Sequence, residues 1–166
     1  INPHFIHNSM QTIIGLICED MDRQAIRVCQ SLSSMLRYNM RFENITDLKS
    51  EIEQAQNYIE IMKIRFEDCF EPVYDFDEAC FGLKMVKFTL QPLIENAISH
   101  GLQDTESGGI LKIRVKKRKK DVNIVIFDNG TGMEKEKKEE LKERLEITTE
   151  NPLQYIEQYK SLGLLN

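Results

Sequence analysis

The sequence has no hydrophobic run close to the roughly 20 residues of a membrane-spanning helix, which argues against a transmembrane segment within it. It has no excess of positive charge: 22 Lys and Arg against 27 Asp and Glu give a net charge of −5, which argues against a nucleic-acid-binding protein. It also lacks any C-x-x-C pair. The four cysteines are dispersed, at Cys18, Cys29, Cys69 and Cys80. This pattern suggests neither a disulfide framework nor a metal site, and it favours reduced thiols in the cytoplasm.

The composition is that of a soluble globular protein, with 41% hydrophobic and 30% charged residues in 166. The opening residues Ile1-Asn2-Pro3-His4 include neither an initiator methionine nor the basic-then-apolar layout of a signal peptide. We therefore expect the chain to come from inside a longer protein whose membrane or sensor portion lies upstream.

The part of the chain before residue 70 has helical periodicity. A first apolar stripe at 4-3-4 spacing consists of Ile6, Met10, Ile13 and Ile17, and a second of Ala25, Val28, Leu32 and Met35. The third and most regular stripe consists of Ile45, Leu48, Ile52, Ala55, Ile59, Met62 and Phe66. Such stripes fit either helix packing within one chain or a helical hairpin that dimerises through its seam. We expect a bundle, with Asn2 capping the first helix, Pro3 at its first position, and Thr46 or Asp47 capping the third.

After residue 70 the helical period gives way to segments that alternate between apolar and polar residues, together with further helical segments. Strands are predicted near 72–76, 111–115 and 122–126, and a helix over 83–100 with Pro92 in the first turn of its final segment. The basic run 116–120 between two alternating segments is interpreted as the solvated end of a hairpin rather than a phosphate-binding patch. Further helices are expected over 134–146 and 152–160.

One predicted helix carries polar residues where an apolar face would be expected. Within Leu90–Gly101, Asn96 and His100 are four residues apart and share a face, and Glu95 precedes them. A buried asparagine without partners costs about 1–3 kcal/mol, so Asn96 should either reach solvent or coordinate something. Mg²⁺ bound to a triphosphate would satisfy it. The alternative is a surface helix whose polar face happens to hold these residues.

A second motif, Asp128-Asn129-Gly130-Thr131-Gly132, directly follows a predicted strand. Asn-Gly is a strong hairpin signal, but residues 134–146 have helical composition and no period of two, so a strand, a glycine loop and a helix are predicted instead. An acid at the strand end can accept a hydrogen bond from an adenine amino group. Glycines let the backbone approach a ligand closely. A third, weaker motif is Ser161-Leu162-Gly163.

In this order, the three motifs resemble the nucleotide-binding boxes of the GHKL superfamily, which includes gyrase, Hsp90, MutL and histidine kinases. The N-terminal motifs narrow the resemblance to the LytS/YesM-type sensor histidine kinases. These motifs are Asn2-Pro3-His4-Phe5, Leu36-Arg37-Tyr38, Tyr58-Ile59-Glu60-Ile61 and Lys63-Ile64-Arg65-Phe66, followed by the Glu95-Asn96-Ala97-x-x-His100-Gly101 box. The resemblance covers nearly the whole chain.

The resemblance implies ATP and Mg²⁺ as ligands and a set of residue roles. His4 would be the phosphoacceptor, with His7 as a competing acceptor three residues later. Asn96 would bind Mg²⁺, and Glu95 would be a catalytic or metal-orienting acid. Phe5 stands where many histidine kinases have an acid after the histidine, so the proton acceptor stays unassigned.

The remaining roles concern the nucleotide pocket. By the same resemblance, His100 would lie near the phosphates and Asp128 would contact adenine. Gly130 and Gly132 would shape the pocket, and Gly163 would lie at the phosphate end of the lid. Ser161 stands where the family usually has a glycine, which departs from its pattern.

The predicted fold class is α+β. Residues 1–68 form a helical dimerisation and phosphoacceptor region, and residues 69–166 an ATP-binding α/β sandwich of the GHKL (Bergerat) type with a mixed sheet covered on one face by helices. Because the chain stops at Asn166, the closing strands are expected to be missing, which leaves this domain truncated at its C-terminus.

The expected function is that of a two-component sensor histidine kinase. It would phosphorylate itself on His4 and pass the phosphoryl group to a response regulator. Its expected partners are a second copy of itself and that regulator, with no nucleic acid and no membrane contact by this part of the protein. Two alternatives stay open: a non-catalytic dimeric signalling module, and a GHKL ATPase without a histidine acceptor.

Overall fold

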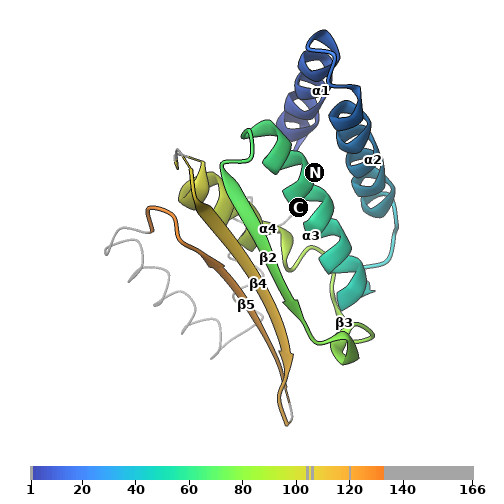
Figure 1. Ribbon diagram of the computed structural model, residues 1–166. Coiled ribbons are helices and arrows are strands. Elements are labelled where there is room, and N and C mark those ends of the chain that lie inside the picture. Colours follow the sequence, from blue (N-terminus) through green and yellow to red (C-terminus); the bar gives the residue numbers. More distant parts are fainter. Residues whose placement is uncertain (1, 104, 106, 120, 133–166) are drawn as a thin grey trace, which may run out of the picture. The chain divides into compact units, whose positions relative to one another are not determined.

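The computed structural model describes residues 2–103, 105, 107–119 and 121–132, and the chain up to Gly132 forms one compact unit (Figure 1). The predictions for 134–146, 152–160, Ser161 and Gly163 lie outside the described residues, and the boundary at residues 68 and 69 stays a prediction. In chain order the elements are helices α1 (Pro3–Cys18) and α2 (Asp22–Asn39), strand β1 (Ile45–Asp47), helix α3 (Leu48–Arg65), strand β2 (Phe70–Phe76), a 3₁₀ turn (Glu78–Cys80), strand β3 (Lys84–Val86), helix α4 (Gln91–Asn96), a π-helical turn (Ala97–Leu102), and strands β4 (Gly109–Lys117) and β5 (Val122–Asp128).

Two of the helices begin where the sequence predicts. The side chain of Asn2 accepts a hydrogen bond of 2.9 Å from the backbone nitrogen of His4, with Pro3 in the first turn of α1. Asp47 caps α3 by accepting from the backbone nitrogen of Ser50 at 2.8 Å. Each cap satisfies a backbone N–H that has no partner inside its own helix.

The prediction of a helix over 83–100 is wrong for the first half of that range. Lys84–Val86 is strand β3, which pairs antiparallel with β1, and α4 begins only at Gln91. A helix through 83–100 would place Pro92 in its interior, where the missing N–H and the clash with a preceding carbonyl disrupt helical hydrogen bonding. In the first turn of α4 Pro92 is tolerated, as expected.

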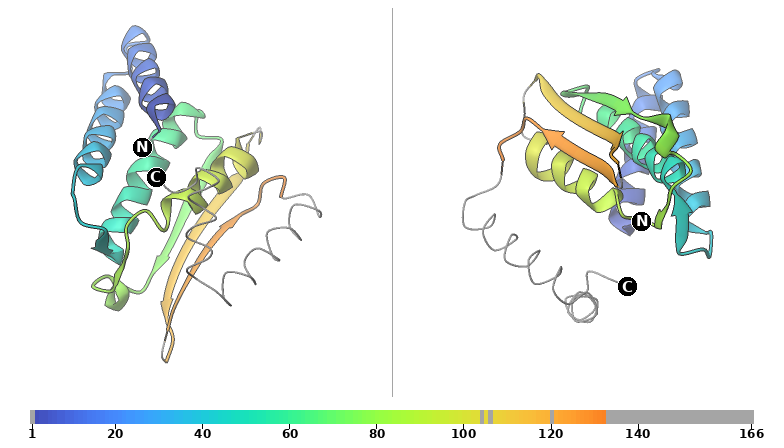
Figure 2. Two further views of the ribbon diagram at one scale, coloured as in Figure 1. Left: turned by 180° about the vertical axis from the view of Figure 1, so that it is seen from behind. Right: turned by 90° about the horizontal axis from the view of Figure 1, so that it is seen from below.

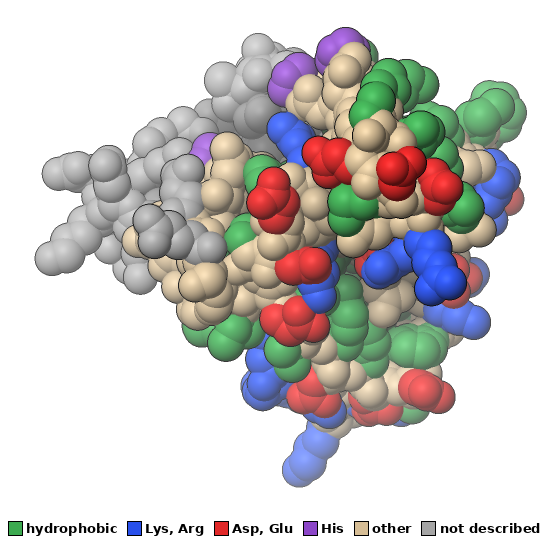
Figure 3. Space-filling view, turned by 45° about the horizontal axis from the view of Figure 1, so that its top comes forward, with side chains coloured by type: hydrophobic (Ala, Val, Ile, Leu, Met, Phe, Trp, Pro, Cys, Tyr) green, Lys and Arg blue, Asp and Glu red, His purple; other side chains and the backbone are tan. Residues whose placement is uncertain are grey.

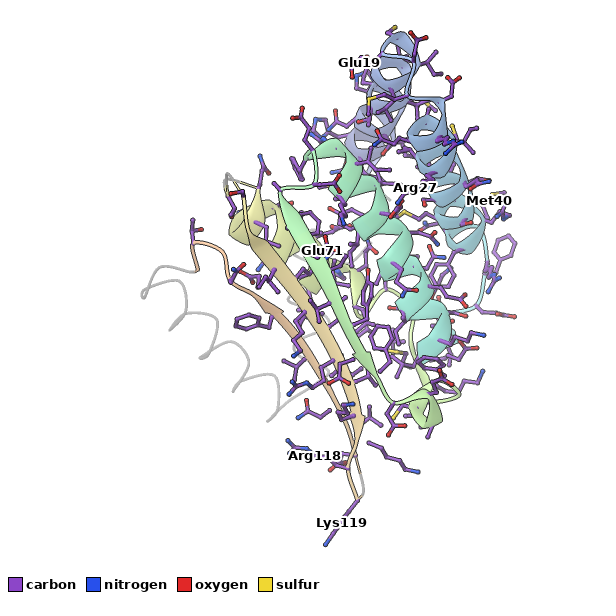
Figure 4. All side chains as sticks on the ribbon, in the orientation of Figure 1. Glu19, Arg27, Met40, Glu71, Arg118 and Lys119 are labelled. Carbon is purple, nitrogen blue, oxygen red and sulfur yellow. The ribbon has the colours of Figure 1, made fainter. Side chains whose placement is uncertain are left out.

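The apolar stripe of α3 is buried within the chain. The five side chains of the stripe that lie inside the helix are at most 4% exposed: Leu48, Ile52, Ala55, Ile59 and Met62. They belong to the same core as Val28, Leu32 and Met35 of α2. At the surface, an ion pair between Glu60 of α3 and Arg27 of α2, which Figure 4 labels, links the two helices. The predicted bundle is confirmed, and of the two alternatives for the stripe of α3 the structure shows packing within one chain.

The second region is a mixed sheet in the order β2-β4-β5. β2 runs parallel to β4, and β4 runs antiparallel to β5. On one face of the sheet Leu111, Ile113 and Val115 of β4 are buried, and α4 with the π-helical turn lies on this side (Figure 2). The predicted α+β class, with helices against one face of a mixed sheet, is confirmed.

The basic run lies at the end of the β4–β5 hairpin. The turn is closed by a hydrogen bond of 2.7 Å from the backbone nitrogen of Arg118 to the carbonyl of Asp121. Arg118 and Lys119 point away from the sheet at its tip (Figure 4), as the interpretation of a solvated hairpin end predicts. Among the described residues, no helix is long and apolar enough to cross a membrane.

Candidate functional site

The two polar motifs of the second region meet through backbone contacts between Gly101 and Gly130. A Cβ atom on Gly130 would overlap the backbone carbonyl of Gly101, and a Cβ atom on Gly101 would lie 2.5 Å from Oδ1 of Asp128. Thr131 donates twice to the π-helical turn, from its nitrogen to the carbonyl of Gly101 (3.2 Å) and from its hydroxyl to the carbonyl of His100 (3.1 Å). At Gly130 only glycine allows so close an approach, because the overlapping atoms belong to the backbone of Gly101.

The π-helical turn makes this contact possible. It is closed by an i to i+5 hydrogen bond of 2.8 Å from the nitrogen of Gln103 to the carbonyl of Ile98. Turns of this kind are rare in helices and occur frequently at functional sites. Here the carbonyls of His100 and Gly101 accept hydrogen bonds from the loop after β5, so the end of the helix is fixed to the glycine loop.

Asn129 anchors the other side of the loop to the start of β4. Its Oδ1 accepts a hydrogen bond of 2.6 Å from the nitrogen of Ile110, and its Nδ2 donates to the carbonyl of Gly108 at 3.1 Å. Sequence reasoning missed this role, because Asn-Gly was weighed only as a turn signal. The half-buried Asp128 ends β5, and its Oδ1 accepts from the nitrogen of Gly130 at 3.1 Å.

The predicted polar residues of the helix lie at the surface. Glu95 and Asn96 of α4 and His100 of the π-helical turn are all exposed, and Glu95 accepts a hydrogen bond of 2.8 Å from the side chain of Gln91. Asn96 therefore reaches solvent, which is one of the two outcomes expected from the cost of burying it. Gly132 has a φ of +73°, in the left-handed region that favours glycine.

His4 lies in the first turn of α1, exposed to solvent, with Nδ2 of Asn8 3.2 Å from its Nδ1 atom. His7 is exposed on the same helix. A cavity of about 220 Å³ has Asn2 and Phe5, the neighbours of His4, in one part of its wall, and Gln91 and Glu95 of α4 in another. The start of α1 and the helix of the second region thus border one common space.

An aromatic contact holds the start of α1 in this position. The ring of Phe5 stacks on Tyr58 of α3, with ring centroids 5.1 Å apart. Burial raises the pKa of the Tyr58 phenol, and the negative charge of Glu95 raises it further. The smaller, charge-dependent part of the shift reflects the proximity of Glu95 on α4 to the point where α1 packs on α3.

The side-chain oxygens of Asn96 and Glu95 fit a magnesium ion that is bound chiefly through a nucleotide. Within the described residues, no three His, Cys, Asp or Glu side chains are grouped so as to hold a metal ion. Mg²⁺ at phosphate sites usually keeps water and substrate oxygens and takes only one or two protein oxygens. The exposed carboxamide of Asn96, next in sequence to the carboxylate of Glu95, offers oxygens of that kind.

Comparisons with known proteins match both regions. The family described as histidine kinase matches residues 1–70, and the family described as histidine kinase-, DNA gyrase B-, and HSP90-like ATPase matches residues 83–161.

Two of the similar curated proteins are named as a sensor protein and a sensor protein kinase. Sensor protein LytS of Oceanobacillus iheyensis is 38% identical over 136 residues, which cover 81% of this chain and 23% of that protein. Sensor protein kinase HptS of Staphylococcus aureus strain USA300 is 41% identical over 132 residues, covering 79% of this chain and 25% of that protein. The chain thus spans about a quarter of the length of these relatives. With helices first and the ATPase-type sheet after them, the chain belongs to the LytS-type sensor histidine kinases of the GHKL superfamily.

Proposed function

We propose that this chain is the catalytic part of a two-component sensor histidine kinase, which binds ATP with Mg²⁺ and phosphorylates His4. The observation that carries the proposal is the cavity bordered by both Glu95 and the neighbours of His4, next to a helix that is fixed to the glycine loop. A phosphoacceptor and a nucleotide site must approach one another for transfer, and these elements supply both sides.

The nucleotide binds where the π-helical turn meets the loop after β5. The half-buried carboxylate of Asp128 accepts a hydrogen bond from the adenine amino group. Gly130 and Gly132 shape the pocket, Gly130 by letting the loop lie against the backbone of Gly101. Asn96 would hold the magnesium ion, which would supply positive charge to neutralise the phosphates. His100 lies toward the phosphate end, and Gly163, outside the described residues, is assigned to the lid.

Histidine suits the transfer because its ordinary pKa leaves much of the ring neutral and nucleophilic near pH 7. A ring nitrogen of His4 forms a bond to the γ-phosphorus while the bond from that phosphorus to the β,γ-bridging oxygen breaks, and ADP leaves. The ring proton passes to a base. Glu95, whose carboxylate borders the shared cavity, is the acid assigned either to this step or to orienting the metal.

The partners follow from the same assignment. Three apolar residues of α1 are exposed at spacings of four and three: Met10, Ile14 and Ile17, at 51–55%. Figure 3 shows exposed hydrophobic side chains next to histidine side chains. This face takes a second copy of the chain, so that the kinase is a homodimer. The phosphoryl group of His4 then passes to an aspartate of a response regulator, and the whole protein carries a membrane-anchored sensor upstream of this cytoplasmic part.

Incubation of the full-length protein with γ-labelled ATP and Mg²⁺ tests the proposal. We expect label on the wild type and on the His7→Gln control, and no label on His4→Gln. His7 is a matched control because it is an exposed histidine one turn along the same helix. Label that persists in His4→Gln would move the acceptor elsewhere.

Two other outcomes would replace the proposal with a different function. Nucleotide binding without any labelled protein would identify a non-catalytic dimeric signalling module. Steady release of phosphate without a phosphoprotein would identify an ATPase that has no histidine acceptor.

A further inference from the structure

Glu51 is a buried carboxylate that joins three parts of the molecule. It lies in the first turn of α3 and is 2% exposed, and among the described residues it is the only acidic or basic one that is buried. Its Oε1 accepts from the hydroxyl of Tyr38 (2.6 Å) and the backbone nitrogen of Phe88 (2.8 Å), and its Oε2 accepts from the backbone nitrogen of Leu90 (3.1 Å). One side chain thus links the end of α2, the start of α3 and the segment before α4.

The segment held by Glu51 has an unusual backbone. Phe88 has a φ of +64°, a left-handed conformation that is unfavourable for a residue with a Cβ atom. Its ring meets Tyr38 edge-on with centroids 5.7 Å apart, and the ammonium of Lys87 lies 4.7 Å from the Tyr38 ring and donates to the carbonyl of Arg41. The carboxylate and these contacts fix residues 87–90 against the helical region.

Stability alone does not explain a buried carboxylate at this junction. Burying a charge removes its hydration, and well-packed apolar side chains often stabilise a protein equally well or better. What three directed hydrogen bonds provide is a defined position for the groups that make them. Two of the groups positioned here are the backbone nitrogens of Phe88 and Leu90, in the segment that leads into α4, the helix of Glu95 and Asn96.

Glu51 also borders the same 220 Å³ cavity as Glu95, Asn2 and Phe5. On the basis of the function proposed above, we infer that Glu51 is a positioning residue that fixes α4 relative to the phosphoacceptor end of α1. None of its three hydrogen bonds goes to the π-helical turn or the glycine loop, which bind each other directly through Gly101 and Gly130. Loss of Glu51 should therefore misplace the two reaction partners and leave the nucleotide site formed.

Glu51→Gln is the most informative substitution. Glutamine keeps the size of the side chain but has one acceptor oxygen, and its NH₂ group cannot accept the hydrogen bond from Leu90, so a buried N–H loses its partner. Glu53→Gln is the matched control. It removes the same charge two residues further along α3, from a side chain that is 55% exposed.

The experiment measures labelling of His4 in the full-length protein at saturating Mg-ATP, together with nucleotide affinity by calorimetry, both normalised to folded protein. For Glu51→Gln we expect labelling to slow by roughly 10- to 100-fold, with affinity within about twofold of the wild type. Glu53→Gln should match the wild type in both. A Glu51→Gln rate equal to that of the wild type, or a rate and affinity that fall together, would overturn the positioning role.

Should Glu51→Gln not fold, Glu51→Asp provides the second test, because it keeps the charge and shortens the reach of the carboxylate to its three partners. Slower labelling with unchanged affinity supports positioning, and unchanged labelling refutes it. Failure of this inference is distinct from failure of the proposed function, because the latter would appear as absence of label on the wild-type protein.

Discussion

Helices α1 and α3 both carry an apolar stripe, but the two stripes differ in what covers them. In α3 the stripe is closed inside the chain, and Ile59 is 1% exposed. In α1 the stripe is partly open: Met10 and Ile17 are 51% and 55% exposed, and Ile14 beside them 54%. Periodicity therefore identifies an amphipathic helix but does not tell whether its apolar face meets the same chain or another one.

Because of this difference in exposure, α1 rather than α3 is the candidate helix for self-association. The most regular heptad pattern, in α3, could have formed a dimer seam, yet α2 and the elements near α4 already occupy it. The less regular stripe of α1 is the one with apolar surface available. Four measurements test this contrast and the account built on it.

The largest expected effect is a difference in stability between substitutions in the two apolar stripes. Ile59→Ala should lower the free energy of unfolding by about 2–5 kcal/mol, because it leaves a cavity in a closed core. Ile14→Ala, measured at concentrations where the protein is monomeric, should change it by less than about 0.5 kcal/mol. Urea denaturation of both variants is the measurement, and equal losses would contradict the contrast.

The second expected effect concerns association. Ile14→Glu should weaken dimerisation at least about tenfold, since it would place an unpaired charge in the interface proposed on α1. Gln11→Glu adds the same charge at an exposed polar position of the same helix and should have a smaller effect. Analytical ultracentrifugation over a range of concentrations distinguishes them, and a dimer that tolerates Glu at position 14 uses another surface.

The smallest effect compares the two helix caps. Asp47→Ala and Asn2→Ala should each cost about 1 kcal/mol at pH 7, because each leaves a helix N–H without its side-chain acceptor. Hydrogen bonds from Ser50 lower the pKa of Asp47 below its ordinary value near 3.8. The stabilisation by Asp47 is therefore complete above about pH 4 and is lost as the pH falls through the lowered pKa.

Stability measured from pH 7 to pH 2 checks this difference between the caps. The advantage of wild type over Asp47→Ala should shrink below about pH 4, whereas its advantage over Asn2→Ala should not titrate, since an amide has no proton to gain. An advantage over Asp47→Ala that stays constant to pH 2 would mean that the cap does not depend on the charge.

Local signals in the sequence predicted much of the fold. Helix starts were predictable at Asn2 and Asp47 because capping is a property of adjacent residues, and the hairpin of β4 and β5 was predictable from alternation. The pairing of β1 with β3 was not, because each has three residues and their partners are about 40 positions apart. Short strands of this kind depend on tertiary contacts more than on propensity.

The site was predictable in its parts but not in its assembly. Asp128 and Gly130 stood out as an acid and a glycine after a strand, but nothing local indicated that Gly130 lies against Gly101. The hydrogen bonds from Thr131 to the π-helical turn and the three hydrogen bonds to Glu51 likewise join distant segments. A buried glutamate looks in a sequence like any polar residue of a surface helix, so its role becomes visible only in three dimensions.

Calorimetric titration of the full-length protein with ATP, with and without Mg²⁺, most directly tests whether the Gly101–Gly130 contact forms a nucleotide site. We predict magnesium-dependent binding by the wild type and by Gly15→Ala, whose added methyl group meets open space. Gly130→Ala should lose binding, because its Cβ would overlap the carbonyl of Gly101. Absence of nucleotide uptake by the wild type, or undiminished binding by Gly130→Ala, would contradict the account.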